Sequence, residues 1–168
     1  MKNYIRTFSL AILSILSMDS SAQLPNGSIA PDFTATDING VEYNLYELLD
    51  AGNVVILDFF ATWCGPCLRE IPALKILETD YHDKNIAFVS LSIDEVKDYD
   101  KWRTMIIEKK LKGIQLMADN NWKSKFVTDY GIKGIPRFII IDIDGRIVNS
   151  DAPRPSNPEI RVILNELL

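Results

Sequence analysis

The strongest constraint on the fold is a nearly continuous apolar run at residues 54–60, with the sequence VVILDFF. Such a run lacks the alternation of a half-exposed strand and is typical of a strand covered on both faces. Asp58 interrupts the run, and a carboxylate is costly to bury without a role. The run therefore predicts a central strand with structure on both sides, and it marks Asp58 as a candidate functional residue.

Segments with strand and helix patterns alternate along the rest of the chain. Asn39-Gly40 lies between two short strand-like segments, 33–36 and 41–44, and predicts an N-terminal β-hairpin. Further strands are expected at residues 86–93, 114–117, 138–143 and 146–149, and helices at residues 45–49, 64–81, 96–112, 121–130 and near the C-terminus. This alternation predicts one α/β domain, residues 23–168, with a central mixed β-sheet flanked by helices.

The chain has only two cysteines and one histidine among its 168 residues. This number is too small for a disulfide-rich scaffold or a closed structural zinc site, so we expect no metal ligands and no bound cofactor. The formal net charge of −5 argues against a nucleic-acid partner. A hydrophobic content of 47% suits one packed domain, which we expect to be a monomer.

Residues 1–22 are typical of a secretory signal peptide. Lys2 and Arg6 precede an apolar stretch at residues 8–18, and small residues follow at 20–22. The stretch has 11 residues, whereas a transmembrane helix needs about 20. We therefore expect an exported, periplasmic protein whose mature chain starts at Gln23, with an uncleaved membrane anchor as the alternative.

Both cysteines lie in one motif, Cys64-Gly65-Pro66-Cys67, between the predicted central strand and a predicted helix. Residues three apart on a helix are close enough for a disulfide, and a helix N-terminus stabilises a thiolate. A purely structural disulfide would close almost no loop here, and a c-type haem site would need a histidine where Leu68 stands. The pair therefore predicts a redox-active Cys64–Cys67 disulfide, with copper binding by two thiolates as the metal-binding alternative.

The segment DFFATWCGPC at residues 58–67 resembles the active site of thioredoxins. Together with segments 30–33 (APDF), 89–94 (VSLSID) and 134–136 (GIP), it makes the chain similar to exported thiol–disulfide oxidoreductases of the TlpA/ResA type. The APDF segment alone also resembles peroxiredoxins, but those have a lone peroxidatic cysteine, so we do not expect a peroxidase. The resemblance implies a thioredoxin-like fold with an N-terminal β-hairpin and a helical insertion at residues 96–112.

The resemblance also implies roles for the residues around the cysteines. In thioredoxins the aspartate at the position of Asp58 is buried behind the pair and manages the proton of the second thiol. Proteins of the TlpA/ResA type carry an acid at the position of Glu70 that tunes the site, so either carboxyl is a candidate proton carrier. Trp63 would form an exposed rim for substrate, and Pro136 would be a cis proline opposite the cysteines, preceded by Ile135, whose backbone pairs with substrate.

We expect the chain to reduce protein disulfides, because Gly-Pro between the cysteines resembles reducing thioredoxins. Cys64 would attack the substrate disulfide and Cys67 would resolve the mixed disulfide. In an exported compartment an upstream membrane electron donor would have to re-reduce the pair, either for cytochrome c maturation or for general extracytoplasmic thiol reduction. The alternatives are a disulfide oxidase or isomerase with the same residues, and a copper-handling thiol chaperone.

Overall fold

A computed structural model describes residues 23–168, so the expected signal peptide at residues 1–22 lies outside the described residues. The described strands form one seven-stranded sheet with the order β2-β1-β5-β4-β3-β6-β7. Within this part of the chain, none of the helices has both the length and the hydropathy needed to cross a bilayer.

The sheet is mixed, as predicted. β3 pairs in parallel with β4 and antiparallel with β6, so it lies near the middle of the sheet. The strands are β1 (Thr34–Asp37), β2 (Glu42–Asn44), β3 (Val54–Phe60), β4 (Ile86–Ser92), β5 (Ile114–Met117), β6 (Arg137–Ile141) and β7 (Ile147–Asn149).

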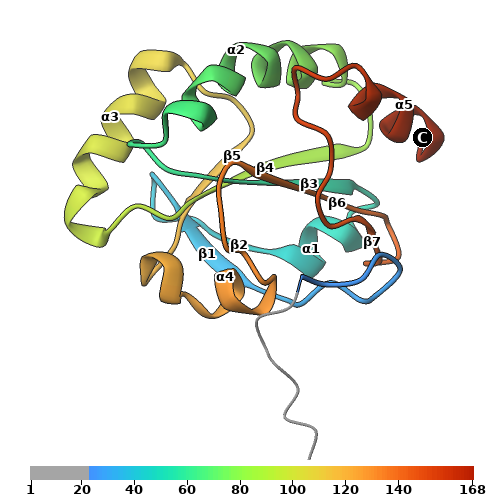
Figure 1. Cartoon of the computed structure of the whole chain (residues 1–168), viewed down its shortest axis with the longest axis horizontal. Helices are drawn as coiled ribbons and strands as arrows, with labels where there is room; N and C mark the ends of the chain where they lie inside the picture. Colours follow the sequence, from blue (N-terminus) through green and yellow to red (C-terminus); the bar gives the residue numbers. More distant parts are fainter. Residues whose placement is uncertain (1–22) are drawn as a thin grey trace, which may run out of the picture.

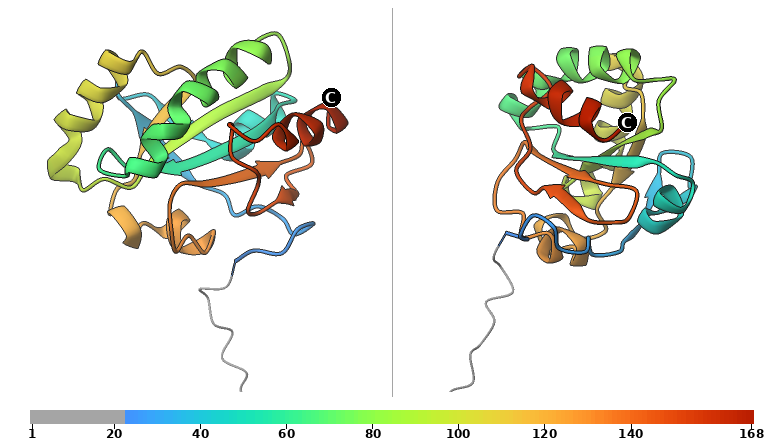
Figure 2. Two further views of the ribbon diagram at one scale, coloured as in Figure 1. Left: turned by 45° about the horizontal axis from the view of Figure 1, so that its top comes forward. Right: turned by 90° about the vertical axis from the view of Figure 1, so that its right-hand side faces the viewer.

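Helices lie on both sides of the sheet (Figure 1). Two views show α2 and α5 over one face, with α3 beside α2, and α1 and α4 on the opposite side (Figure 2). The helices are α1 (Leu45–Asp50), α2 (Gly65–Asp80), α3 (Tyr99–Lys109), α4 (Lys125–Asp129) and α5 (Glu159–Glu166). The arrangement is the expected thioredoxin-like α/β fold, with α3 inserted between β4 and β5.

β3 is buried at all seven of its positions, which confirms the prediction from its apolar run. Val55, Leu57 and Phe59 join an apolar cluster with side chains of α1 and α4. Val54 and Ile56 point the other way and join a second cluster with side chains of α2 and α5. The strand therefore forms the wall between two cores, and its C-terminal end is held firmly between them.

The predicted N-terminal hairpin is present. β1 and β2 pair antiparallel, and Gly40 in the turn has a φ of +81°, a conformation that favours glycine. The Asp37 carboxylate accepts hydrogen bonds from the backbone N–H groups of Asn39 and Val41, at 2.8 and 2.9 Å. These bonds close the turn and fix the register of the pair.

The helix predicted over residues 96–112 is shorter in the structure. A 3₁₀ turn over Val96–Asp98 precedes α3, and α3 ends at Lys109 because Lys110 adopts a left-handed conformation with a φ of +49°. On its buried side, Trp102, Met105 and Ile106 pack into the core. The predicted helical spacing is therefore correct, although the ends of the helix are not.

The helix predicted over residues 121–130 is divided in two. A 3₁₀ turn over Asn121–Lys123 is separated from α4 by Ser124, whose backbone is extended with a ψ of 139°. The Ser124 hydroxyl donates to the carboxylate of Asp119, which lies before the 3₁₀ turn.

Candidate active site

The two cysteines lie at the junction of β3 and α2. Cys64 immediately precedes α2, and its sulfur accepts a hydrogen bond from the backbone N–H of Cys67 at 3.2 Å. The two residues form a disulfide with an S–S distance of 2.04 Å and a Cα–Cα distance of 5.2 Å. Pro66 lies in the first turn of the helix, where its missing N–H breaks no helical hydrogen bond. The fold thus places the pair at a helix N-terminus, whose unpaired N–H groups stabilise a thiolate.

A buried carboxylate fixes the turn between β3 and the cysteines. Asp94, just after β4, accepts hydrogen bonds from the backbone N–H of Thr62 at 2.9 Å and from the Thr62 hydroxyl at 2.7 Å. The Ser92 hydroxyl also donates to Asp94, at 2.7 Å. Asp94 is fully buried, so these bonds are shielded from water and hold Thr62 in one position two residues before Cys64. The sequence reasoning assigned Asp94 no role.

Only part of the motif is accessible in the disulfide form. Cys64 and Cys67 are 4% and 5% exposed, whereas the neighbouring Trp63 is 55% exposed. An exposed tryptophan beside a reactive cysteine offers apolar contact area to a partner. Trp63 therefore has the exposure expected of a rim residue, and its contact with substrate stays a prediction.

The peptide bond between Ile135 and Pro136 is cis, as the resemblance implied. Arg137, the next residue, pairs with Phe59 near the end of β3. This register places Pro136 level with the point where the chain leaves β3 for the cysteine motif. Ile135 packs against the apolar cluster that contains both cysteines. The structure therefore places Ile135 and Pro136 at the end of the sheet where the cysteine motif begins, and their role in substrate binding stays a prediction.

Asp58 lies behind the disulfide, on the face of β3 that α2 covers. It lines one small cavity together with Cys67. Burial and the charges of Glu78 and Glu70 together raise the pKa of the Asp58 carboxyl to about 8, against the opposing effect of a hydrogen bond with the Ser90 side chain. A carboxyl with this pKa beside a thiol is suited to accept and return a proton near neutral pH.

Glu70 is buried as well, but it bonds to a different part of the molecule. Its carboxylate accepts hydrogen bonds from the backbone N–H and the hydroxyl of Ser156, both at 3.1 Å. Ser156 belongs to the segment that leads into α5, so Glu70 ties α2 to the C-terminal segment. Unlike Asp58, Glu70 does not line the cavity beside Cys67. Its role in tuning the active site stays a prediction.

Sequence reasoning missed three polar residues near Asp58. Glu78, Ser90 and Gln115 are buried and line the same cavity as Asp58 and Cys67. The helical spacing of Cys67 and Glu78, eleven residues or about three turns apart, was a usable signal for Glu78. The other two depend on strand register, which no local pattern indicates.

Comparisons with known proteins decide the family. A family model described as the AhpC/TSA family matches residues 26–150, which is most of the chain. The chain belongs to the AhpC/TSA family.

Several proteins whose sequences are similar to that of this AhpC/TSA protein are named thiol–disulfide oxidoreductases. Thiol–disulfide oxidoreductase ResA from Bacillus cereus is 31% identical over 130 residues, which cover 73% of this chain and 66% of the relative. The chain thus spans slightly less than two thirds of the length of this relative. The expected similarity to the TlpA/ResA type is confirmed.

Solved structures that are similar to this chain are also described as thiol–disulfide oxidoreductases. The solution structure of a protein from Bacteroides vulgatus, assigned as a thiol–disulfide oxidoreductase, is 43% identical with a TM-score of 0.72, over 89% of this chain and 93% of that one. A thiol–disulfide oxidoreductase from Bacteroides fragilis is 25% identical with a TM-score of 0.75, over 84% of this chain and all of that one (100%).

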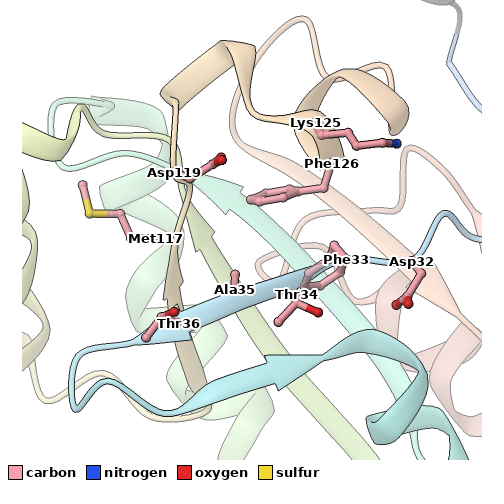
Figure 3. A pocket seen from close by; sticks show the side chains of 9 residues that line it. All are labelled: Asp32, Phe33, Thr34, Ala35, Thr36, Met117, Asp119, Lys125 and Phe126. Atoms are coloured by element: carbon pink, nitrogen blue, oxygen red, sulfur yellow. The ribbon is translucent and has the colours of Figure 1, made fainter.

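A second cavity of this AhpC/TSA protein, about 420 Å³ in volume, lies between β1 and α4 (Figure 3). Phe33 of the APDF segment and Phe126 face each other there, with ring centroids 5.4 Å apart. The Tyr130 hydroxyl donates to the carbonyl of Pro31 at 2.8 Å. Neither cysteine lines this cavity. The APDF segment therefore acts in packing the N-terminal hairpin onto α4.

Proposed function

We propose that this chain is an exported thiol–disulfide oxidoreductase that reduces protein disulfides by dithiol exchange through Cys64 and Cys67. The observation that carries the proposal is the Cys64–Cys67 disulfide at the N-terminus of α2, with the buried carboxyl of Asp58 lining the same cavity as Cys67. The names of the relatives support the same reaction.

The reaction begins with both cysteines reduced. The Cys64 thiolate attacks one sulfur of a substrate disulfide, a mixed disulfide forms, and the other substrate sulfur leaves as a thiolate. Cys67 then gives its proton to Asp58 and attacks the sulfur of Cys64. The substrate leaves with both of its sulfurs reduced, and Cys64 and Cys67 are left oxidised as a disulfide. Asp58 is suited to this transfer because its pKa of about 8 lies near that of a thiol.

The surface around Cys64 is the proposed substrate site. Trp63 would contribute apolar contact, and the backbone of Ile135 before the cis Pro136 would pair with an extended substrate segment. This arrangement is supported by the exposure of Trp63 and by the register that places Pro136 level with the end of β3. Binding through backbone hydrogen bonds would accept many sequences, as in other strand-addition modes of recognition.

The proposed compartment is the periplasm, on the basis of the signal-like residues 1–22. A reductase there needs a source of two electrons, since the compartment is oxidising, and we assign this task to an upstream membrane electron donor. Cytochrome c maturation and general extracytoplasmic thiol reduction are the two proposed settings.

The reductase activity is tested by the reduction of insulin with dithiothreitol as the electron source. Wild-type protein should accelerate the reaction, and both Cys64→Ser and Cys67→Ser should abolish the acceleration. Trapping in the native host separates the two cysteines. Cys67→Ser should accumulate mixed disulfides with substrate proteins, whereas the double variant Cys64→Ser/Cys67→Ser should not. Wild-type protein without insulin reductase activity would refute the proposal.

The direction of exchange is tested separately by equilibrating the Cys64–Cys67 pair with glutathione buffers. A reductase should have a potential near that of thioredoxin, about −270 mV, and an oxidase a potential near that of DsbA, about −120 mV. Copper titration of the reduced protein tests the chaperone alternative, for which tight binding by the two thiolates is required.

A further inference from the structure

A row of polar side chains crosses the middle of the sheet beneath α2. Asp58 on β3 pairs with Ser90 on β4, and Ser90 pairs with Gln115 on β5. Residues paired across neighbouring strands point to the same face, so the three side chains lie side by side on the face that α2 covers. All three are buried. The row interrupts an otherwise apolar layer, and buried polar groups of this kind need partners.

Glu78 joins the row from the helix side. Three buried oxygen atoms have no hydrogen-bond partner among the described residues: Asp58 Oδ1, Glu78 Oε2 and Gln115 Oε1. All three residues line one cavity of about 10 Å³, and Cys67 and Ser90 are also in its wall. A buried water needs about this much space and two to four polar partners. The cavity therefore has the size and the lining of a site for one water molecule.

Glu78 also lies at the boundary between this cavity and the solvent. Lys112, which is exposed, and Lys75, which is half-buried, line the same cavity. Burial raises the pKa of the Glu78 carboxyl and the charges of Lys112 and Lys75 lower it, and the net value is about 7. Gly113 leaves room for the carboxylate, because a Cβ at that position would lie 2.9 Å from Glu78 Oε1. Glu78 is therefore placed between the interior carboxyl of Asp58 and two lysines at the surface.

We propose that Asp58, Glu78 and Gln115 hold one water molecule, and that Glu78 passes the proton between Asp58 and the solvent beside Lys75 and Lys112. This inference rests on the proposed dithiol exchange and adds a second carboxyl to its proton path. Without such a path, the proton that Asp58 takes from Cys67 would stay in a closed interior, since Asp58 is 8% exposed.

Each transfer in the path balances. The S–H bond of Cys67 breaks, its proton joins the Asp58 carboxylate, and the sulfur electron pair forms the bond to Cys64 as the substrate thiolate leaves. The Asp58 proton then moves to the water while a proton of the water moves to the Glu78 carboxylate. Glu78 finally releases its proton to the solvent. The reverse sequence supplies protons when the disulfide is reduced, and the only redox change is the thiol–disulfide exchange itself.

The charges that face the two carboxyls come from α2 and from the residues that precede β5. Glu70 and Glu78 are the charged side chains that raise the pKa of Asp58, and Lys75 and Lys112 are those that lower the pKa of Glu78. Removing the Glu78 charge should therefore lower the pKa of Asp58, because a like charge disfavours ionisation.

The first test is a ¹³C NMR titration of the side-chain carboxyls in the disulfide form of the protein. Glu78→Gln, which keeps the shape of the side chain, should lower the midpoint of the Asp58 titration by about one pH unit. The matched control is Glu108→Gln, which removes the same charge from an exposed position and should leave the Asp58 midpoint unchanged.

The second test is the pH dependence of mixed-disulfide resolution, followed by stopped flow. Glu78→Gln should slow resolution near neutral pH by about tenfold and move the profile, since proton transfer is impaired. Gln115→Met, which keeps the length of the side chain but removes the water ligand, should act in the same direction. In an Asp58→Asn background Glu78→Gln should have almost no further effect, because the path starts at Asp58.

The proposal requires both results. An Asp58 midpoint that stays in place in Glu78→Gln, or a pH profile of resolution that superimposes on the wild-type profile, would overturn it. The NMR titration needs no enzymatic activity, so its result is independent of the proposed function. An inactive wild-type protein would refute the reductase proposal, whereas an active wild-type protein with unchanged Glu78→Gln behaviour would refute the relay alone.

Discussion

Thr62 and Asp94 are joined by two hydrogen bonds, from the backbone N–H of Thr62 to Oδ2 at 2.9 Å and from its hydroxyl to Oδ1 at 2.7 Å. The two residues are 32 positions apart in the sequence, and the pairing of β3 with β4 brings them together. This contact fixes the backbone that leads into Cys64, so the geometry of the active site depends on a residue that takes no part in the exchange.

Asp94→Asn should therefore destabilise the protein by about 1–3 kcal/mol, since an amide replaces one of two charged acceptors in a buried site. Urea unfolding measures the loss. The control is Asp100→Asn, an exposed position on α3, which should change the unfolding free energy by less than about 0.5 kcal/mol. Equal losses of unfolding free energy in Asp94→Asn and Asp100→Asn would contradict this role of Asp94.

The ionisation of Asp58 should make the stability of the protein fall as the pH rises. Asp58 has a pKa of about 8 in the folded protein and an ordinary value of 3.8 when unfolded, so between these values the folded form holds one more proton. The contribution of Asp58 to stability is then greatest in acid and is lost at up to about 1.4 kcal/mol per pH unit until the folded pKa is passed. Asp58→Asn should reduce this slope between about pH 5 and about pH 8, as measured by urea unfolding, and the raised pKa of Glu78 should maintain a smaller slope up to about pH 7. Parallel curves for the two proteins would contradict the raised pKa.

Substitutions of Glu70 and of Asp58 should have different effects on activity. Asp58→Asn should remove the Asp58 step from the pH profile of disulfide exchange, whereas Glu70→Gln should keep that step and move it toward lower pH. Glu70 bonds to Ser156 and does not line the cavity, so it acts on Asp58 only through its charge. Glu70→Gln should instead lower the unfolding free energy by about 1–2 kcal/mol through the lost charged acceptor. Loss of the step in Glu70→Gln, rather than its movement, would make Glu70 a proton carrier.

Gly113→Ala should destabilise the protein by about 1–3 kcal/mol. Its φ is +66°, and a Cβ there would lie 2.7 Å from the carbonyl oxygen of Phe88, as well as close to Glu78. Gly52→Ala is the matched control, since Gly52 has a φ of +82° but nothing within 4 Å of the added carbon. Both variants have the backbone strain, but only Gly113→Ala has the steric clash, so the difference between their thermal unfolding temperatures measures the clash. Equal decreases in the unfolding temperature would exclude the clash.

Trp63→Ala should weaken the binding of protein substrates without affecting the chemistry of the pair. We expect KM for insulin to rise by about tenfold, the loss typical of a truncated aromatic contact, with the reduction of the pair by dithiothreitol unchanged. Trp122→Ala is the control, because Trp122 is a partly exposed tryptophan, at 37%, that lies outside the active-site motif. A comparable rise in KM for both variants would argue against a specific role for Trp63.

Much of the fold and part of the site could be predicted from the sequence because they depend on local patterns. The apolar run of β3, the turn at Gly40 and the cysteine spacing each act within a few residues. The cis bond before Pro136 could not be obtained from the residues and came only from the resemblance to thioredoxins.

The other features depend on how distant segments meet. The bond between Glu70 and Ser156 spans 86 positions, and the neighbours of Asp58 follow from the register of three strands. The extended backbone of Ser124 interrupts a helical pattern that looks continuous in the sequence. Helical spacing could place Glu78 on the same side of its helix as the second cysteine, but its position beside Asp58 depends on how the helix packs on the sheet, which periodicity does not indicate.

The polar row beneath α2 sets stability and activity against each other. Replacing Asp58, Glu78 and Gln115 with apolar side chains of similar volume would remove buried, poorly paired polar groups, and such replacements often stabilise a protein. The same replacements would leave the second thiol without a group to take its proton. A sequence optimised only for thermal stability would therefore have an apolar layer at the centre of this sheet. The resulting protein would have a higher unfolding free energy and would exchange disulfides slowly.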